Sequence, residues 1–391
     1  MSELVLPQGV KYIDGHRFRA AFIAGAQAII NDRAYLNKIN VFPVPDADTG
    51  TNLASTVQAV AAELPTDASL GKVVTDAADA ALMGSRGNSG IIFAQFLYGL
   101  SKSLKGEKLA TPAKFVEAAR VSVEHVYDSL LNPVEGTILT VMRSWSVALE
   151  KFSATSDDFQ VILHKSFEVA EKALRDTPKQ LEVLAKAGVV DSGAKGFVDL
   201  LQGISEFMRA GNLRDIPVFE KPEESVEIHQ FSGDDDIPYR YCTEALISDA
   251  QIDFVEVKRK AESFGDSVVV AGSPQRLRLH VHTNDPAELF DWLREKGELA
   301  SMKAEDMIRQ FEVSNKRKYP IALVTDSACD LPQEIIEKYQ INVIPFTVNF
   351  GENSYLDKVT ITPDKFYSLL DAAPVHPSPA QPSPAMVSNL L

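Results

Sequence analysis

The chain has little cysteine and lacks an apolar run long enough to span a membrane. Its 391 residues include only Cys242 and Cys329. Two cysteines are too few for a disulfide framework, which fits a reducing cytoplasm. The first residues lack a basic segment followed by a long apolar core, so no targeting peptide is predicted. We therefore expect a cytoplasmic protein with no integral membrane segment.

An excess of basic residues is also missing. The formal net charge is -15 at pH 7, and no basic cluster offsets it locally, which argues against nucleic-acid binding. Nucleotide binding stays compatible with this charge, because metal ions and helix N-termini can neutralise phosphate. With 45% hydrophobic and 24% charged residues, the chain has an ordinary globular composition and room for two or three domains.

What the sequence does contain is a proline-braced acidic segment, Asn40-Val41-Phe42-Pro43-Val44-Pro45-Asp46-Ala47-Asp48-Thr49-Gly50-Thr51-Asn52. Pro43 and Pro45 hold the backbone extended. Asp46 and Asp48 are then predicted to point the same way, as alternate residues of a strand do. Paired carboxylates beside a helix N-terminus suit a divalent cation and the phosphates that it carries.

The residues after the two aspartates predict the start of a helix. Gly50 permits a sharp turn, and Thr49 or Thr51 can cap the apolar helix that continues to Leu64. Taken alone, an Asp-x-Asp pair is also compatible with a solvated acidic turn, because Asp, Gly and Thr are common turn residues.

A helical period dominates the first two hundred residues or so, which are predicted to be all-α. Besides the helix that follows the aspartates, amphipathic runs are predicted at 14–39, 70–83, 91–104, 112–131, 138–152, 158–175 and 196–208. Loops of small residues separate several of them, at 84–90, 132–137 and 191–196. One glycine loop is equally a flexible linker, but three such loops before helices indicate that several helix N-termini converge.

The acidic segment closely resembles the magnesium-binding signature of the dihydroxyacetone-kinase ATP-binding (DhaL-type) domain family, in the version found in bacterial fatty acid kinases. The three loops resemble the later nucleotide-contact segments of that family, in the same order. The resemblance implies an antiparallel α-helical barrel whose rim binds ATP through two magnesium ions. It makes Asp46 and Asp48 the metal ligands and catalytic residues. A third acidic ligand in many members corresponds to Asn40, which can supply one neutral oxygen.

The same resemblance implies a set of nucleotide-contacting residues. They lie in the acidic segment and in the three loops: Thr49, Gly50, Thr51, Asn52, Gly84, Gly87, Asn88, Ser89, Gly90, Gly136, Thr137, Asp191, Ser192 and Gly193.

After an acidic linker predicted at 211–237, the pattern becomes mixed α/β. The segment 276–282 alternates, so that Leu277, Leu279 and Val281 face a core while His280 and His282 share the opposite face. Two imidazoles at this spacing form half of a metal site.

Cys242 and Glu244 also share one face of a predicted strand. If that strand pairs with the histidine strand, Cys242, His280 and His282 can form a three-ligand zinc site. The alternative is two surface histidines and a buried thiol. Tyr-Cys-Thr-Glu and His-Val-His-Thr-Asn resemble the central domain of fatty acid kinases, where the Cys and both His are associated with zinc and with activity. That resemblance favours the metal site and makes His280 and His282 candidate catalytic residues.

The third region begins near residue 318. A buried parallel-type strand is predicted at 321–327, a helix at 332–339 and a second strand at 343–348. Asp326 and Ser327 are candidate ligand contacts because they follow the first strand, although an Asp-Ser helix cap explains them equally well. The pattern resembles the start of DegV-family fatty-acid-binding proteins, which makes Asp326 and Ser327 candidate lipid-binding residues. The family's Thr-Ser pair is absent before Gln381, and we expect an incomplete segment.

These observations predict a multidomain chain. A DhaL-like helical-barrel kinase domain is expected at 10–210, an α+β domain with the Cys/His site at 238–316, and a partial α/β DegV-like segment at 318–391. The resemblance implies a kinase that uses ATP and Mg²⁺, with Zn²⁺ as a further candidate, to phosphorylate a fatty acid presented by a separate DegV-type protein. A dihydroxyacetone-type small-molecule kinase and a non-catalytic nucleotide- or lipid-sensing module are the alternatives. A homodimer is a further candidate assembly.

Overall fold

The computed structural model describes residues 9–210, 237–249, 253–273, 275–382 and 387. The chain divides into two compact units, one of Met1–Glu223 with Val269–Ser273 and one of Glu224–Val268 with Pro274–Leu391. The acidic linker predicted at 211–237 lies outside the described residues, except for its last position. Within the described parts of the chain, none of the helices combines the length and the apolar character needed to cross a membrane.

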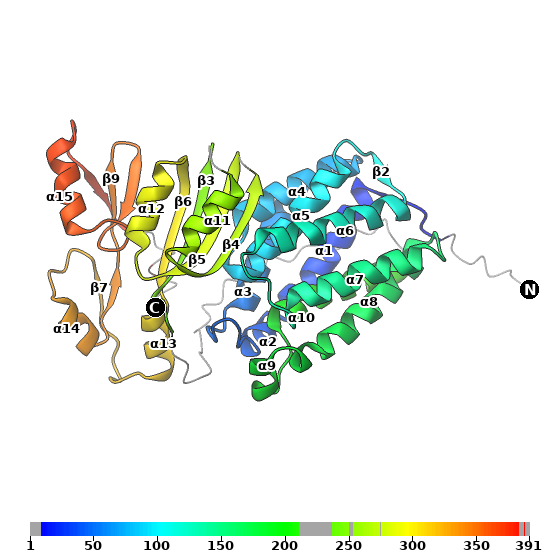
Figure 1. Ribbon diagram of the computed structural model, residues 1–391, viewed down its shortest axis with the longest axis horizontal. Coiled ribbons are helices and arrows are strands. Elements are labelled where there is room, and N and C mark those ends of the chain that lie inside the picture. Colours follow the sequence, from blue (N-terminus) through cyan, green and yellow to red (C-terminus); the bar gives the residue numbers. More distant parts are fainter. Residues whose placement is uncertain (1–8, 211–236, 250–252, 274, 383–386, 388–391) are drawn as a thin grey trace, which may run out of the picture. The chain divides into compact units, whose positions relative to one another are not determined.

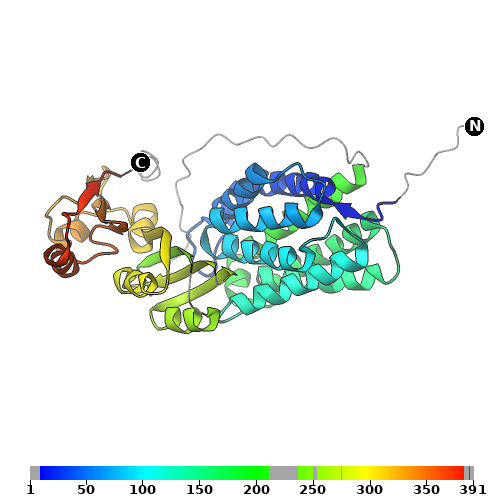
Figure 2. The same cartoon turned by 90° about the horizontal axis from the view of Figure 1, so that it is seen from above.

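Residues 9–210 of the first unit are helical, as predicted, apart from a two-residue strand pair, β1 (Ile13–Asp14) with β2 (Leu109–Ala110). Its helices lie side by side in Figures 1 and 2. Their bounds are α1 Gly15–Asn31, α2 Arg33–Lys38, α3 Thr49–Glu63, α4 Leu70–Gly84, α5 Gly87–Leu104, α6 Pro112–Ser129, α7 Ile138–Ser153, α8 Phe159–Arg175, α9 Glu182–Ala187 and α10 Ser192–Ala210, with a 3₁₀ turn at Thr177–Lys179.

The predicted lengths of one helix and of two loops in this unit are wrong. The single helix predicted at 14–39 is two helices, because Asp32 ends α1 and precedes α2. Asp and Asn side chains compete with the helical backbone for hydrogen bonds, and Asn31-Asp32 is such a site. The loops predicted at 84–90 and 191–196 are also much shorter, since α5 already begins at Gly87 and α10 at Ser192.

Helices α1 and α10 approach each other closely, at glycines on both. A Cβ atom on Gly203 would lie 2.5 Å from the carbonyl oxygen of Ala24, and one on Gly25 would lie 2.7 Å from that of Leu200. Because both neighbours are backbone atoms, only residues without a side chain permit this crossing.

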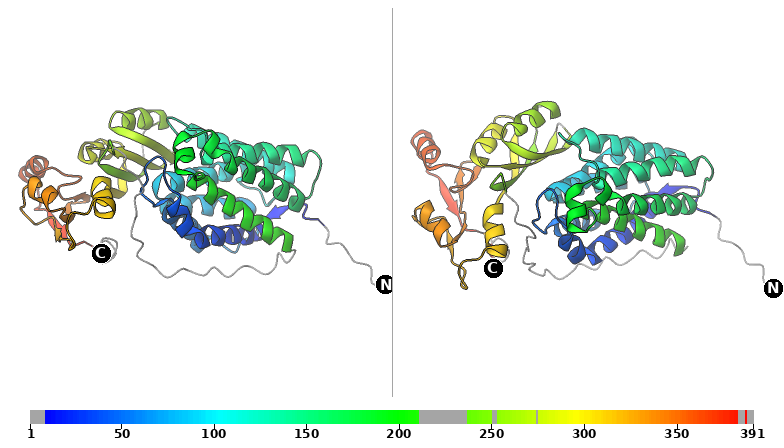
Figure 3. Two further views of the ribbon diagram at one scale, coloured as in Figure 1. Left: turned by 90° about the horizontal axis from the view of Figure 1, so that it is seen from below. Right: turned by 60° about the horizontal axis from the view of Figure 1, so that its bottom comes forward.

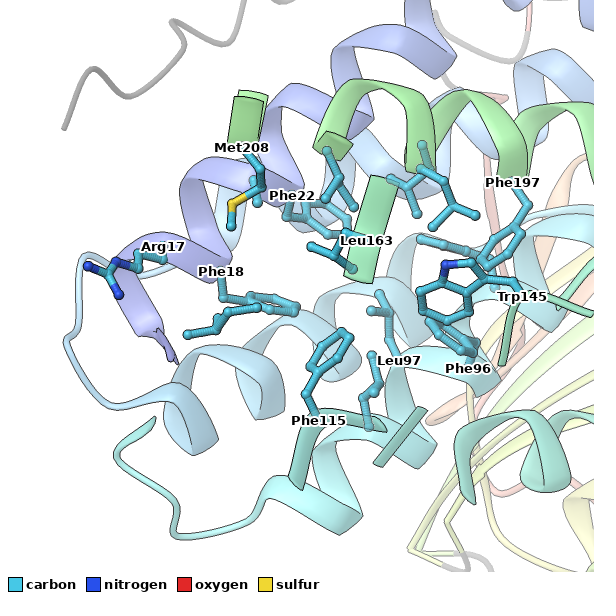
Figure 4. Close-up of a pocket in the computed structure, with 17 residues that line it drawn as sticks. Arg17, Phe18, Phe22, Phe96, Leu97, Phe115, Trp145, Leu163, Phe197 and Met208 are labelled. Carbon is cyan, nitrogen blue, oxygen red and sulfur yellow. The ribbon is translucent and has the colours of Figure 1, made fainter. Parts of the chain in front are cut away.

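Aromatic side chains fill much of the interior of the helical unit. Trp145 packs edge-to-face against Phe96 and Phe197, with ring centroids 6.1 and 5.6 Å apart. A cavity of about 70 Å³ lies among these and other apolar side chains, while Arg17 at its edge directs its guanidinium away from them (Figure 4). The indole Nε1 of Trp145 is buried and has no hydrogen-bond partner among the described residues.

The second unit includes most of a four-stranded sheet in the order β4-β5-β3-β6, with β5 and β6 both antiparallel to β3. Helices α11 (Phe254–Glu262) and α12 (Pro286–Arg294) cover one face of it (Figures 1 and 3). The strands are β3 Tyr241–Ser248, β4 Gly265–Ser273, β5 Arg276–Thr283 and β6 Glu298–Asp306, and α13 (Met307–Asn315) follows. Leu277, Leu279 and Val281 are fully buried, as the alternation predicts.

The rest of this unit contains short strands. The elements are β7 Val324–Asp326, α14 Gln333–Lys338, β8 Asn342–Ile344, β9 Thr347–Phe350, β10 Asn353–Leu356, α15 Pro363–Ala372 and β11 Ser378–Ala380. The strand predicted at 343–348 is divided between β8, which pairs with β7, and β9, which pairs with β10 and β11.

The prediction of a buried strand at 321–327 is wrong. Ile321 is 75% exposed, Leu323 49% and Val324 39%. Strand β7 has three residues and, among the residues that the structure describes, pairs with β8 alone, in a two-stranded parallel sheet. Parallel strands are buried where further strands and helices cover them, and two strands do not provide that cover.

Candidate metal and nucleotide sites

Asp46 and Asp48 come together in a turn. Ala47 between them has φ 54, in the left-handed region, so the extended arrangement predicted for this segment is wrong. The two side chains nevertheless share a hydrogen bond, and burial together with the adjacent charge of Asp48 holds the pKa of Asp46 well above its ordinary range. A buried carboxyl group next to a second carboxylate forms a site that favours a cation.

The start of α3 also differs in detail from the prediction. Asp48 occupies the N-cap position, and Thr49 is already the first helical residue, so neither Thr49 nor Thr51 is the cap. Gly50 lies inside the helix and makes no turn. A Cβ atom there would be 2.2 Å from the carbonyl oxygen of Arg33, so Gly50 allows α2 to pack closely against α3.

Asn40 is 2% exposed and lies within this turn. Its Nδ2 donates to Asp46 Oδ1 at 2.9 Å and to the carbonyl oxygen of Val44 at 2.8 Å. Its Oδ1 accepts a hydrogen bond from the Thr49 hydroxyl. Asn40 thus presents its amide nitrogen to Asp46, an arrangement that orients the carboxylate, and its place as a Mg²⁺ ligand stays a prediction.

Helix α5 begins against the first turn of α3. Gly87 has φ +59, and a Cβ atom there would lie 2.3 Å from Asn52 Nδ2. A Cβ on Gly90 would lie 2.5 Å from Thr56 Oγ1. Asn88 Oδ1 is buried and makes no hydrogen bond within the described chain. Asn52 in α3 and the first turn of α5, which are far apart in the sequence, are therefore neighbours.

The start of α10 joins the same group. A Cβ atom on Gly193 would lie 2.9 Å from Ser89 Oγ, and the Ser192 hydroxyl donates to the carbonyl oxygen of Leu36 at 2.7 Å. The structure thus brings the first turns of α3, α5 and α10 together. Gly84 is not among them, because a Cβ there would meet Ala59, near the far end of α3.

Asp191 connects the starts of α7 and α10. Its Oδ1 accepts from the backbone N–H of Ala194 at 2.8 Å, and the backbone N–H of Ile138 also donates to it. Burial raises the pKa of Asp191 to about 6, against these two hydrogen bonds. Thr137 caps α7 through Leu139 N at 3.4 Å. The Asp191 carboxylate therefore accepts its hydrogen bonds from backbone N–H groups at the starts of two helices.

Sequence analysis missed the side chains that shape the loop before α7. Glu135 Oε2 accepts hydrogen bonds from Arg143 Nη2 at 2.7 Å and from the Thr140 hydroxyl. The Thr140 hydroxyl in turn accepts from Gly136 N at 2.8 Å. Gly136 has φ +82 and lies against Gln180 and Leu181. A pair eight residues apart across a helix start carries no local sequence signal, which explains the omission.

The strand pairing on which a Cys/His site depends is present. Cys242 on β3 lies opposite His282 on β5, and Glu244 lies opposite His280. The candidate ligand atoms of Cys242, His280 and His282 all lie within 4.8 Å of one another. Both histidines are buried, at 2% and 5% exposure, so the alternative of two surface histidines is wrong.

These three residues fit a zinc ion. Tetrahedral zinc with N and S ligands at about 2.0–2.3 Å keeps its ligand atoms about 3.3–3.8 Å apart, and the candidate atoms would have to move to within that range of one another from a spacing of up to 4.8 Å. Nε2 of His280 is buried and has no hydrogen-bond partner within the described residues. A buried lone pair of this kind is suited to a metal ligand.

The two residues predicted to contact a lipid differ in accessibility. Asp326 is exposed at the end of β7, where its Oδ1 accepts from Ala328 N at 3.0 Å. Ser327 is 1% exposed, and its hydroxyl accepts from Phe346 N at 3.0 Å. The contacts of Ser327 are those of a residue that holds its own backbone, so its role in lipid binding remains a prediction.

Comparison with known proteins places three families along the chain. The DAK2 domain family matches residues 43–206. The FakA-like middle-domain family, whose name refers to fatty acid kinase, matches residues 238–314, and the DegV family of uncharacterised proteins matches residues 320–391.

Curated proteins similar to this chain occur in staphylococci. An uncharacterised protein of Staphylococcus epidermidis is 33% identical over 311 residues, which cover 77% of this chain and 56% of the relative. One of Staphylococcus saprophyticus is 34% identical over 320 residues, which cover 79% and 58%. One of Staphylococcus aureus is 33% identical over 322 residues, which cover 79% and 59%. The chain thus spans somewhat over half the length of these relatives.

Among solved structures, the dihydroxyacetone kinase from C. freundii in complex with AMP-PNP and Mg²⁺ aligns with a TM-score of 0.40 and 18% sequence identity. The alignment covers 53% of this chain and 36% of that chain. A likeness of this degree is too low to establish a common fold.

Proposed function

We propose that this protein is an ATP- and Mg²⁺-dependent kinase that transfers the γ-phosphoryl group of ATP to a fatty acid carboxylate. The products are an acyl phosphate and ADP. The observation that carries the proposal is the contact of Asp46 with Asp48 at the start of α3, beside the first turns of α5 and α10. The DAK2 match over 43–206 supports the same assignment.

Each group in this site has a distinct task. Asp46 and Asp48 would hold Mg²⁺, which supplies charge neutralisation to the phosphates, and Asn40 keeps Asp46 oriented. The first turns of α3, α5 and α10 expose backbone N–H groups, which are suited to phosphate oxygens. Catalysis of phosphoryl transfer consists mainly of such positioning and charge stabilisation. Asp191 would set the spacing between the starts of α7 and α10.

The second unit would serve the acceptor. Cys242, His280 and His282 would hold Zn²⁺, which as a Lewis acid can orient a carboxylate oxygen. The acceptor would be a fatty acid presented by a DegV-type protein, because the middle-domain and DegV matches accompany the DAK2 domain. The same two matches disfavour a dihydroxyacetone-type acceptor. The paired carboxylates of the first unit disfavour a purely nucleotide- or lipid-sensing module.

The test is a radiolabelled transfer assay with the full chain. A fatty acid together with a DegV-type protein is offered in one arm and dihydroxyacetone in the other. We expect label in the fatty acid arm, and Asp48→Asn should lower the rate by at least about 10²-fold with the circular dichroism spectrum unchanged. Asp157→Asn, at an exposed carboxylate that pairs with Lys11, should retain full activity.

Each contrary outcome has a defined meaning. An unaltered rate in Asp48→Asn would sink the metal assignment. Label in dihydroxyacetone alone would establish the small-molecule kinase instead. Binding of ATP with no product in either arm would support the sensing module.

A further inference from the structure

Glu244 is a carboxylate buried beside the candidate zinc ligands. It lies on β3 with 2% of its surface exposed. Its Oε2 is 2.8 Å from Arg278 Nη2, and its Oε1 is 3.5 Å from His280 Nδ1. Across the other edge of β3 it is in register with Lys303. The two carboxylate oxygens therefore face different partners.

Arg278 determines where this carboxylate points. The ion pair between them is buried, with side-chain exposures of 8% for Arg278 and 2% for Glu244. A buried ion pair stabilises a protein less than well-packed apolar residues of similar volume do, so its presence here requires another reason. With Oε2 bound to Arg278, Oε1 remains directed at His280.

Nδ1 of His280 has two neighbours, Glu244 Oε1 at 3.5 Å and Cys242 Sγ at 3.9 Å. A carboxylate is a stronger hydrogen-bond acceptor than sulfur, so the ring proton belongs on Nδ1, facing Glu244. The lone pair of the neutral ring then lies on Nε2, the buried atom without a hydrogen-bond partner in the described structure. Only this tautomer leaves Nε2 free to bind a metal.

We propose that Glu244 is the positioning residue of the zinc site, holding His280 in the tautomer and orientation that presents Nε2 to the ion. The proposal rests on the zinc site of the proposed function. Metal-binding histidines commonly donate their second ring N–H to a carboxylate in this way.

The carboxylates beside the two histidines differ in their exposure to water. His282 Nδ1 is 3.5 Å from Asp266 Oδ1, but the Asp266 side chain is 51% exposed. An exposed carboxylate competes with water for its hydrogen bonds, whereas Glu244 is buried and fixed by Arg278. Metal affinity therefore depends more on Glu244 than on Asp266.

The experiment measures zinc affinity with the metal alone. The full chain is stripped with a chelator and titrated with Zn²⁺ against a competing indicator dye. Glu244→Gln keeps the shape of the side chain and should weaken zinc binding about 10- to 100-fold. The matched control is Glu305→Gln. Glu305 is in register with Cys242 on β6 but pairs with Lys303 at 2.9 Å, so its loss should change the affinity by less than about threefold.

A second variant separates metal binding from folding. The double change Glu244→Leu with Arg278→Leu removes the buried ion pair as a unit, which is often neutral for stability. We expect this variant to fold and to bind zinc as weakly as Glu244→Gln. Wild-type affinity in either variant would overturn the role of Glu244. Failure of the wild-type chain itself to bind Zn²⁺ would overturn the zinc site, while leaving the Mg²⁺-dependent transfer assay to judge the kinase.

Discussion

The Asn40 side-chain amide donates a hydrogen bond to Asp46 Oδ1 at 2.9 Å, from a position that is almost fully buried. A neutral donor at this distance orients the carboxylate without adding charge to it. This hydrogen bond helps to set the arrangement of the acidic pair, which leads to the first prediction.

Asn40→Ala should weaken Mg²⁺ binding and transfer activity even though both aspartates remain. The change removes the hydrogen bonds to Asp46, Val44 and Thr49, so the free energy of unfolding should fall by about 1–3 kcal/mol. Asn37→Ala is the matched control, because Asn37 is also buried and bonds Thr51 at 2.9 Å. It should lose comparable stability but retain Mg²⁺ affinity. Calorimetric Mg²⁺ titration and urea unfolding give the two readouts, and equal Mg²⁺ affinities would contradict the role of Asn40.

Asp191 predicts a specific pH dependence of stability. Its pKa is about 6 in the folded protein and 3.8 as an isolated group, so the folded state holds the proton more tightly. The resulting stabilisation is complete below pH 3.8 and is lost as pH rises through about 6. At pH 7, where Asp191 is ionised, the folded state is therefore less stable by about 3 kcal/mol than with the protonated group.

Asp191→Asn keeps the acceptor oxygen and removes the charge. It should be more stable than wild type at pH 7, and the difference should shrink by about 1 kcal/mol on going to pH 5. Urea unfolding of both proteins at the two pH values measures this. A difference that is the same at both would show that Asp191 does not titrate as described.

The close crossing of α1 and α10 predicts unequal effects of two glycine substitutions on one helix. Gly203→Ala forces a Cβ against the backbone of Ala24 at 2.5 Å and should destabilise by about 1–3 kcal/mol. Gly196→Ala meets the side-chain end of Leu53 at 2.4 Å, which can rotate away. Both changes gain the same intrinsic helix propensity. In thermal unfolding, Gly196→Ala should therefore have a higher Tm than Gly203→Ala. The reverse order of the two Tm values would refute the backbone clash.

Glu337 holds α14 against the preceding part of the second unit. Its Oε1 pairs with Arg240 at 2.7 Å and its Oε2 with Arg309 at 2.6 Å. Glu337→Ala should loosen the segment and raise its rate of cleavage in limited proteolysis about tenfold. Glu334→Ala, at an exposed position of the same helix, should leave the rate unchanged. Equal cleavage of the two variants would show that these ion pairs do not anchor α14.

Local patterns in the sequence were sufficient wherever periodicity decides the outcome. The alternation across 276–282 correctly predicted the buried row Leu277, Leu279 and Val281, because residues two apart share a face of any strand. The same rule predicted that Cys242 and Glu244 share one face of their strand and that His280 and His282 share one face of theirs. Antiparallel pairing of the two strands then brings these residues together. The helical periods located most helices of the first unit, although the run at 14–39 is two helices and the starts of α5 at Gly87 and α10 at Ser192 were placed too late.

Only the tertiary structure decided how separate segments meet. The contact of Asp46 with Asp48 depends on the left-handed turn at Ala47, and nothing in the local pattern distinguishes that turn from an extended run. Asp191 bonds helix starts more than fifty residues apart, and Ser89 meets Gly193. The apolar strand near Val324 is exposed because covering it requires further strands. Sequence periodicity determines which side of a helix or strand is apolar. Which other element packs against that side depends on the packing of the whole chain.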